Sequence, residues 1–575
     1  MLSVGNSIFF LLVNIVTLIN CDNLIVKTIT GQVKGVVLTT LLKNREYIAY
    51  RGIPYAEPPI GHLRFKAPLP IAPWPKVLSA AKFGNSCMVL AHAKLFPLNS
   101  TQSENCLYLN VFTPVMESKK YNSRKAVMFY IHGGGLAEGD GTDGLFGPDF
   151  LIDEDVVVVT INYRLGPWGF SNFDIKGYTG NMGFKDQQLA LEWVARNILY
   201  FGGNPNLITV IGQSAGGAST HFHMLSERSR KCIRRAICMS GVAFSPFADY
   251  RPNNHIEFYK KVFALDAQLT GNDVLNFMLT APTETIVRKM PAFNIHNCIF
   301  SAYFAAVIEE DETKADQPFL TQHPRDIYKT TKVKVDAMFG FTSAEEIMVA
   351  TPDFVNDYYS ASKNNYYHWI QPMQNCSMIE LPFSGLTLSQ NSFEYRQASK
   401  KIYRYYFGTR KIKPTLENLN IYVQLSSDIN YLWSIQEALR LHSKGAKTFC
   451  YENQLDLSLN AYKLWLPTLY GTSHSEDLFY LFFSKKYAKL YTDVLAKPND
   501  ARNRKTLKAL HYFPKLFADF AKTGKARNLV TFGNLTDCIR ITNDGLKPSS
   551  RERTDTMHFW DEIYNSVKPW IVNPF

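Results

Sequence analysis

The residues best suited to carry chemistry in this sequence surround Ser214. Residues 212–216 read Gly-Gln-Ser-Ala-Gly and match the pattern G-x-S-x-G. The β-branched run at 208–211 predicts a buried strand, and the segment that follows the serine motif predicts a helix through residue 225. A serine at such a turn needs small neighbours, and its oxygen stands at a helix N-terminus where backbone N–H groups favour negative charge. The pattern therefore predicts a nucleophile rather than an incidental serine in a glycine-rich loop.

A second motif, His-Gly-Gly-Gly at residues 132–135, directly follows an apolar run at 127–131. Consecutive glycines can turn several backbone N–H groups toward one point. An acyl-transfer enzyme needs such donors for the tetrahedral oxyanion, and losing one costs roughly 3–4 kcal/mol in the transition state. Together with Ser214, this motif predicts acyl transfer.

A sheet must hold these two motifs in place, and the hydrophobic pattern predicts one. Several strand-like runs are apolar on both faces, which indicates a sheet covered by helices on both sides. Strands alternating with helices favour the α/β class with a large, mostly parallel sheet. The expected strands are 107–112, 127–131, 156–161, 208–211, 333–339 and 448–451, and the expected helices are 184–201 and 507–522. Residues 24–40 predict a hairpin, and residues 50–61, rich in proline and glycine, predict an irregular segment.

Composition is that of a globular protein with 575 residues and a formal net charge of +12. The charge is diffuse, because no run of five or six Lys or Arg residues with interleaved aromatics occurs, so nucleic acid is not an expected partner. No Pro/Gly/Ser linker, internal repeat or low-complexity tract divides the chain. We therefore expect a single, much-inserted domain over residues 22–575.

The first residues predict export. Residues 1–21 contain a short apolar stretch without Lys or Arg, which suits a signal peptide better than an uncleaved anchor, so we expect a secreted protein. Removal of Cys21 would leave eight of the nine cysteines, an even number typical of an oxidising compartment. Sequons at Asn99, Asn375 and Asn534 are then candidate glycosylation sites. No later segment has 18 uninterrupted apolar residues, so no stable membrane span is expected.

Neither a metal nor a cofactor is implied. The sequence has no C-x-x-C pair, and His221 and His223 are two residues apart on a helix, so they face different ways. Residues 139–144 match G-x-G-x-x-G, but they do not open a helix after a strand, as a dinucleotide site requires.

The ordered motifs resemble the type-B carboxylesterase/cholinesterase family of α/β-hydrolases, and most closely its insect members. The resemblance runs nearly end to end. It covers residues 52–59, 64–65, 104–111, 132–135, 161–166, 180–187, 201–205, 471–480, 520–524 and 559–560. It implies an α/β-hydrolase fold with long insertions and a serine hydrolase.

The resemblance also assigns roles to residues. Ser214 matches the nucleophile, Glu345 the orienting acid and His474 the catalytic base, in the chain order typical of this fold. A base of this kind predicts activity that rises with pH through about 6.5. The oxyanion donors are matched by the backbone N–H groups of Gly134, Gly135 and Ala215.

Two features depart from the family pattern. The family usually has glycine after the acid, whereas Glu346 follows Glu345 here, so either carboxylate could serve. The match through residues 342–345 favours Glu345. Gln213 replaces the acidic residue that cholinesterases carry before the serine.

Cys87 and Cys106 resemble the family's N-terminal disulfide pair, and the remaining cysteines cannot be paired from sequence. The segment between these two contains no tryptophan, although cholinesterases carry an aromatic choline-binding residue there. A quaternary ammonium group needs aromatic faces and negative charge. This absence and the neutral Gln213 therefore disfavour choline esters.

The resemblance thus implies a secreted serine esterase for small, uncharged carboxylic esters, with its oligomeric state left open. A broad carboxylesterase for xenobiotic, odorant or lipid-like esters is the first expectation, and a juvenile-hormone esterase is the alternative. A different class, a non-catalytic cholinesterase-like adhesion module, remains a third possibility, although such modules typically lose triad residues.

Overall fold

The computed structural model describes most of the chain. The described residues are 24–91, 101–115, 124–248, 254–291, 293–296, 299–309, 313–350, 379, 381–383, 386–410, 416–462, 469–526, 528–533, 537–548 and 551–571.

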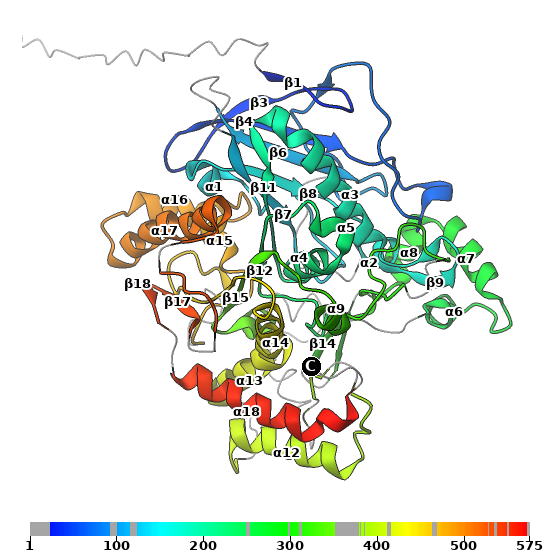
Figure 1. Cartoon of the computed structure of the whole chain (residues 1–575), viewed down its shortest axis with the longest axis vertical. Coiled ribbons are helices and arrows are strands. Elements are labelled where there is room, and N and C mark those ends of the chain that lie inside the picture. Colours follow the sequence, from blue (N-terminus) through cyan, green and yellow to red (C-terminus); the bar gives the residue numbers. More distant parts are fainter. Residues whose placement is uncertain are drawn as a thin grey trace, which may run out of the picture.

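An 11-stranded mixed sheet forms the centre of the molecule (Figure 1). From β17 to β8 the neighbouring strands are parallel, and the pairs at both edges are antiparallel. This confirms the predicted mostly parallel centre. In spatial order the strands are β18 (Gly545–Lys547), β17 (Ile539–Thr542), β16 (Thr448–Gln454), β15 (Asp336–Thr342), β12 (Arg235–Met239), β11 (Gly203–Gln213), β7 (Lys125–Ile131), β8 (Val157–Ile161), β6 (Tyr108–Pro114), β4 (Glu46–Pro54) and β3 (Val36–Thr39).

Helices cover both faces of this sheet, as the apolar runs predicted. Successive side chains of a strand point to opposite faces, so Val127 and Phe129 of β7 enter one hydrophobic core while Met128 and Tyr130 enter the other. The first core also contains residues of α3 (Met182–Asn197) and α4 (Ala215–Leu225). The second contains residues of α1 (Asp149–Asp153), α15 (Leu478–Leu481), α16 (Ala488–Ala496) and α17 (Ala501–Thr523).

Further helices and small sheets surround this body, and α12 and α18 lie side by side at one end (Figure 1). Among the described residues, no helix combines the length and apolarity needed to cross a bilayer. The surrounding helices are α2 (Gly166–Phe170), α5 (Glu227–Arg230), α6 (Ile256–Phe263), α7 (Gly271–Thr280), α8 (Thr283–Lys289), α9 (Pro324–Thr330), α12 (Phe393–Phe407), α13 (Leu416–Ser427), α14 (Trp433–His442) and α18 (Arg551–Val567). The small sheets contain β1 (Ile25–Lys27), β2 (Gln32–Lys34), β5 (Leu78–Ser79), β9 (Asn172–Ile175), β10 (Tyr178–Thr179), β13 (Phe293–His296) and β14 (Ile299–Ala302).

The predicted hairpin at 24–40 is present as the antiparallel pair β1 and β2. The prediction of an irregular segment at 50–61 is wrong for its first residues, because β4 extends to Pro54. The side chains of Tyr50 and Ile53 are buried in the core, and the strand register shifts between them. Gly52 lies inside that irregularity with φ +70°, which explains a glycine within a strand. β12 was not predicted.

Candidate active site

Ser214 stands at the turn between β11 and α4. Its φ of 60° and ψ of −128° are unusual for a residue with a Cβ, and such strained backbone clusters at functional sites. Close backbone packing explains the glycines around it. A Cβ on Gly216 would lie 2.0 Å from the carbonyl oxygen of Ile131, and one on Gly241 would lie 2.0 Å from that of Ser214.

His474 and Glu345 meet at the carboxyl end of the neighbouring strands. Glu345 follows β15, and its Oε2 lies 2.6 Å from Nδ1 of His474. Its other oxygen accepts hydrogen bonds from the Ser240 hydroxyl at 2.7 Å and from the Thr342 N–H at 2.6 Å. The backbone N–H of His474 donates a hydrogen bond to the backbone carbonyl of Glu345 at 3.0 Å. Both side chains are buried, and the contact holds the Nδ1 edge of the imidazole against the Glu345 carboxyl group.

Glu346, the competing carboxyl, faces away from the imidazole. Its Oε1 accepts a hydrogen bond from the Asn430 amide at 3.2 Å, and its backbone N–H donates to the Ser427 hydroxyl at 3.1 Å. Burial, and then the charge of Glu345, raise the pKa of Glu346 to about 8. Glu346 is therefore largely uncharged at pH 7, and Glu345 is the carboxylate on His474.

The remaining contacts of the His474 ring come from Gln213 and Tyr431. The Gln213 amide nitrogen lies 3.0 Å from Nε2 and 3.5 Å from Nδ1, and the centroid of the Tyr431 ring lies 4.8 Å from that of the imidazole. Within the described chain, the hydroxyl of Ser214 is not among the hydrogen-bond partners of the ring.

The glycine loop after β7 packs against Ser214. A Cβ on Gly133 would lie 2.9 Å from the Ser214 Cβ. Gly134 and Gly135 have φ values of +105° and +59°, and within the described residues their N–H groups have no hydrogen-bond acceptor. Ala215 opens α4, where N–H groups lack an intrahelical acceptor. The arrangement brings free backbone donors to the side of the serine turn.

The two helix histidines are separated, as their spacing predicted. Nε2 of His221 lies 2.7 Å from the Tyr328 hydroxyl, whereas Nε2 of His223 lies 2.9 Å from Oε1 of Gln187. The described residues contain no group of three or more His, Cys, Asp or Glu side chains placed to hold a metal ion.

A disulfide bond joins Cys87 to Cys106, the pair expected from the family resemblance. A second joins Cys450 of β16 to Cys538, which the sequence could not pair. Cys232 and Cys238 are free thiols. The predicted signal peptide, Cys298, Cys376 and the three sequon asparagines at 99, 375 and 534 lie outside the described residues.

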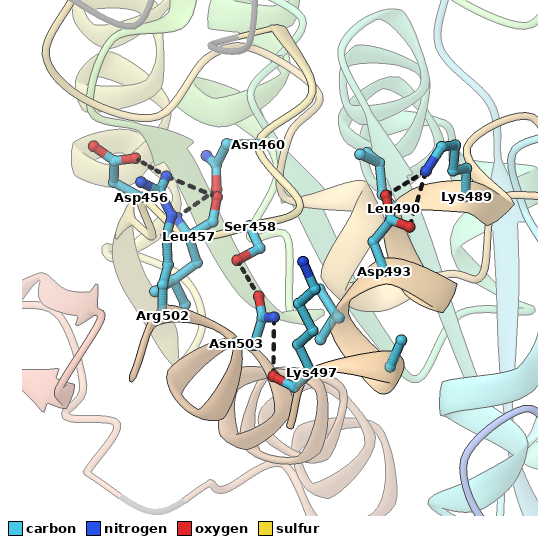
Figure 2. Close-up of a pocket in the computed structure, with 12 residues that line it drawn as sticks. Asp456, Leu457, Ser458, Asn460, Lys489, Leu490, Asp493, Lys497, Arg502 and Asn503 are labelled. Atoms are coloured by element: carbon cyan, nitrogen blue, oxygen red, sulfur yellow. Dashed lines mark hydrogen bonds and ion pairs between the residues drawn. The ribbon is translucent and has the colours of Figure 1, made fainter. Parts of the chain in front are cut away.

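A cavity of about 790 Å³ between α16, α17 and the segment 456–460 is separate from this site (Figure 2). Figure 2 shows Arg502 turned toward Asp456, and Asn503 between Ser458 and Lys497. Its polar groups thus largely bond to one another. None of Ser214, Glu345 or His474 lines it, so this cavity is not where an ester would meet the serine.

The sequence missed several groups that shape the site. Ser240 binds Glu345, Gly241 packs on Ser214, and Tyr431 packs on His474. No motif marks them, and they come from segments far from Ser214 or His474 in the chain. Only the close approach of these segments in the fold reveals their roles.

Residues 22–557 match the family described as Carboxylesterase family. Venom carboxylesterase-6 of Apis mellifera is 33% identical over 465 residues, which are 79% of this chain and 79% of that protein. The juvenile hormone esterase of Tribolium castaneum is 30% identical over 483 residues, 81% of this chain and 78% of that protein. A solved structure of the juvenile hormone esterase from Manduca sexta, with OTFP covalently attached, aligns with a TM-score of 0.76 at 24% identity, covering 94% of this chain and 99% of that one.

The family match covers nearly the whole chain, and the solved structure has the same fold. The mixed sheet, with helices on both faces, is that of an α/β-hydrolase. The chain belongs to the carboxylesterase family and is a carboxylic ester hydrolase.

Proposed function

We propose that the chain hydrolyses uncharged carboxylic esters through an acyl-enzyme on Ser214, with His474 as base and Glu345 as the acid that orients it. The observation that carries this proposal is the 2.6 Å contact between buried His474 and Glu345. It lies at the carboxyl ends of the parallel strands, where the strained Ser214 stands. In this proposal the serine, the acid and the histidine meet at the carboxyl ends of the parallel strands, the place where open α/β sheets bind ligands.

In this proposal the Ser214 oxygen attacks the ester carbonyl while Nε2 of His474 takes its proton. The N–H groups of Gly134, Gly135 and Ala215 hold the oxyanion of the tetrahedral intermediate. The imidazolium then gives its proton to the departing alcohol. Water attacks the acyl-enzyme by the same route and releases the acid.

Hydrolysis of a naphthyl ester by wild type, Ser214→Ala and Ser219→Ala tests the proposal. Ser219 lies one turn along α4 and bonds to the Ala215 carbonyl, so its variant controls for loss of a helix hydroxyl. We expect Ser214→Ala to lose nearly all turnover and Ser219→Ala to retain it. Equal turnover by wild type and Ser214→Ala would exclude Ser214 as the nucleophile.

The substrate proposal is a broad range of uncharged esters. The neutral amide of Gln213 beside His474 supports it, because an acidic residue there would favour cationic substrates. A juvenile-hormone esterase is the second candidate, supported by 30% identity to the Tribolium castaneum enzyme of that name. The ratio of kcat/KM values for a long terpenoid methyl ester and a short aryl ester separates the two. A ratio far above one supports the second candidate.

We also propose that the protein is secreted and glycosylated. Two disulfide bonds support export, because disulfides persist in oxidising compartments. Expression of the full chain in insect cells tests this. We expect the protein in the medium, with a mass that falls after glycosidase treatment. Retention inside the cells would contradict the proposal.

A further inference from the structure

Gln213 contacts the catalytic histidine directly, and the mechanism above does not use it. Its side chain is buried, and its amide nitrogen lies within 3.5 Å of both ring nitrogens of His474. The two nitrogens of an imidazole flank one carbon, so an atom this close to both lies over the face of the ring. Nε2 is the ring nitrogen nearer to the amide, at 3.0 Å.

Among the described residues, three side chains hold the ring. The Glu345 carboxylate holds its Nδ1 edge, the Gln213 amide covers a face, and Tyr431 packs against it with the two ring planes at 41°. Gln213 is also the last residue of β11, directly before the nucleophile. Any movement of the serine turn therefore moves the amide that covers the base.

Resting on the proposed function, we propose that Gln213 is a positioning residue that holds the His474 ring in the orientation in which Nε2 serves Ser214. When His474 takes the serine proton, rotation of the amide can present the oxygen instead. That oxygen now lies on the side of Gly133, where a Cβ would be 3.1 Å away.

Other titratable groups face the same ring, and the test must separate them. Glu345 binds Nδ1, and the Tyr431 ring packs beside it. Asp477 lies nearby. Burial, and then the charge of Glu345, raise the pKa of Asp477 to about 7, while His474 lowers it. Burial, and then the charges of Glu346 and Glu345, raise the pKa of Tyr431. The variant Asp477→Asn therefore belongs in the experiment as a control for a second group that titrates near neutral pH.

The experiment compares wild type, Gln213→Met, Gln213→Glu and Asp477→Asn by kcat, KM and the pH profile of kcat/KM. Methionine keeps the length but lacks the amide, so we expect kcat to fall about 10-fold with KM little changed. Glutamate keeps the shape and adds charge beside the ring. We expect the midpoint of the acid limb to rise by about one pH unit or more, because a nearby opposite charge favours the protonated ring. Asp477→Asn removes a negative charge coupled to His474, so it should move that limb down rather than up.

Wild-type kcat in Gln213→Met together with an unshifted acid limb in Gln213→Glu would overturn this proposal. Melting temperatures of the variants identify a purely structural effect, which lowers stability without moving the pH profile. A fluorophosphonate probe separates the two levels of inference. If the probe fails to label Ser214 in wild type, the proposed function fails. If wild type is labelled and active and the Gln213 variants match it, only the role of Gln213 fails.

Discussion

At the scale of single residues, two adjacent carboxyls have different environments. Glu345 accepts hydrogen bonds from Ser240 and Thr342 and holds His474, whereas Glu346 faces Asn430. The carboxyl group of Glu345 thus has three hydrogen-bond partners. Burial disfavours the charge of Glu346. Neighbours in sequence thus take separate roles.

This difference predicts unequal effects of the same substitution. Glu345→Gln should lower kcat on the order of 10³- to 10⁴-fold, because the imidazole loses its orienting charge. Glu346→Gln should change kcat less than about 10-fold, since an uncharged group is replaced by an uncharged amide. Ester turnover of the two variants measures this. A larger loss in Glu346→Gln would show that the roles are reversed.

Glu346 also predicts how stability depends on pH. Its pKa is raised from 4.5 to about 8 in the folded protein, so between these values the folded state keeps a proton that the unfolded state has lost. The free energy of unfolding contributed by this group is present below about pH 4.5 and is lost as pH rises toward 8, by on the order of a few kcal/mol.

Urea unfolding at pH 5 and pH 8 checks this. We expect the stability of Glu346→Gln to fall less between the two pH values than that of wild type. Asp477 acts in the same direction, from 3.8 to about 7, so Glu346→Gln should remove only part of the decline. An identical decline in both proteins would contradict the prediction.

At the scale of elements, the serine turn depends on contact between β11, α4 and the loop after β12. Gly241 in that loop lies against the Ser214 backbone, where a Cβ would be 2.0 Å from the carbonyl oxygen. Gly241→Ala should displace the turn and lower kcat by roughly 100-fold or more, since small misplacement of reacting groups costs about that much. Gly533→Ala, where the nearest atom would be 3.3 Å away, is the matched control. Unchanged kcat in Gly241→Ala would mean that the turn tolerates the shift.

The loop that carries His474 is tied to a second loop through buried Glu476. Its carboxylate accepts hydrogen bonds from the Ser473 N–H at 2.8 Å, the Asn460 amide at 2.7 Å and the Tyr462 N–H at 3.0 Å. Asn460 also lines the cavity of Figure 2. Two hydrogen bonds, from Asn460 to Glu476 and from the Ser473 N–H to Glu476, therefore connect the cavity wall to the residue before His474.

This connection predicts that Glu476→Gln loosens the His474 loop. An amide cannot accept at both oxygen positions, so we expect kcat to fall about 10-fold while KM changes little. Asn503→Ala, on the opposite cavity wall, should leave kcat unchanged. Equal kcat in Glu476→Gln and wild type would show that the loop is held by other contacts.

At the scale of the whole molecule, the sheet gathers the site. Ser214 follows β11 and Glu345 follows β15, and β12 lies between these two parallel strands. The carboxyl ends of parallel strands all lie on the same side of the sheet, so residues that follow different strands meet there although they are distant in sequence. Two hydrophobic cores, one on each face, keep these strands in register.

The two disulfides should contribute unequally to stability. The Cys450–Cys538 bond spans 88 residues and the Cys87–Cys106 bond spans 19. A longer closed loop removes more entropy from the unfolded chain, so each bond is worth roughly 2–4 kcal/mol, and the longer should be worth more. Chemical unfolding of the two double Cys→Ser variants measures this. Greater destabilisation by loss of the Cys87–Cys106 bond would contradict the chain-entropy account.

Local sequence patterns account for most strands and helices around the serine and for the types of residue that could act there. Apolar runs, glycine turns and the G-x-S-x-G pattern depend on neighbours in the chain, so local patterns predicted β7, β8, β11 and α4 to within a few residues. β12 was missed because it is short, with five residues, and β4 was only partly predicted because its mixed sequence includes glycine and proline. Both are stabilised as strands by pairing with their neighbours.

Which groups touch became apparent only from the packed fold. The contact of Glu345 with His474, the position of the Gln213 amide beside His474 and the Cys450–Cys538 bond all depend on the approach of distant segments. The physical reason is that side-chain direction, burial and charge environment belong to the packed chain. A local pattern specifies a turn or a strand, but a contact between residues 129 positions apart, such as His474 with Glu345, exists only once the whole sheet has formed.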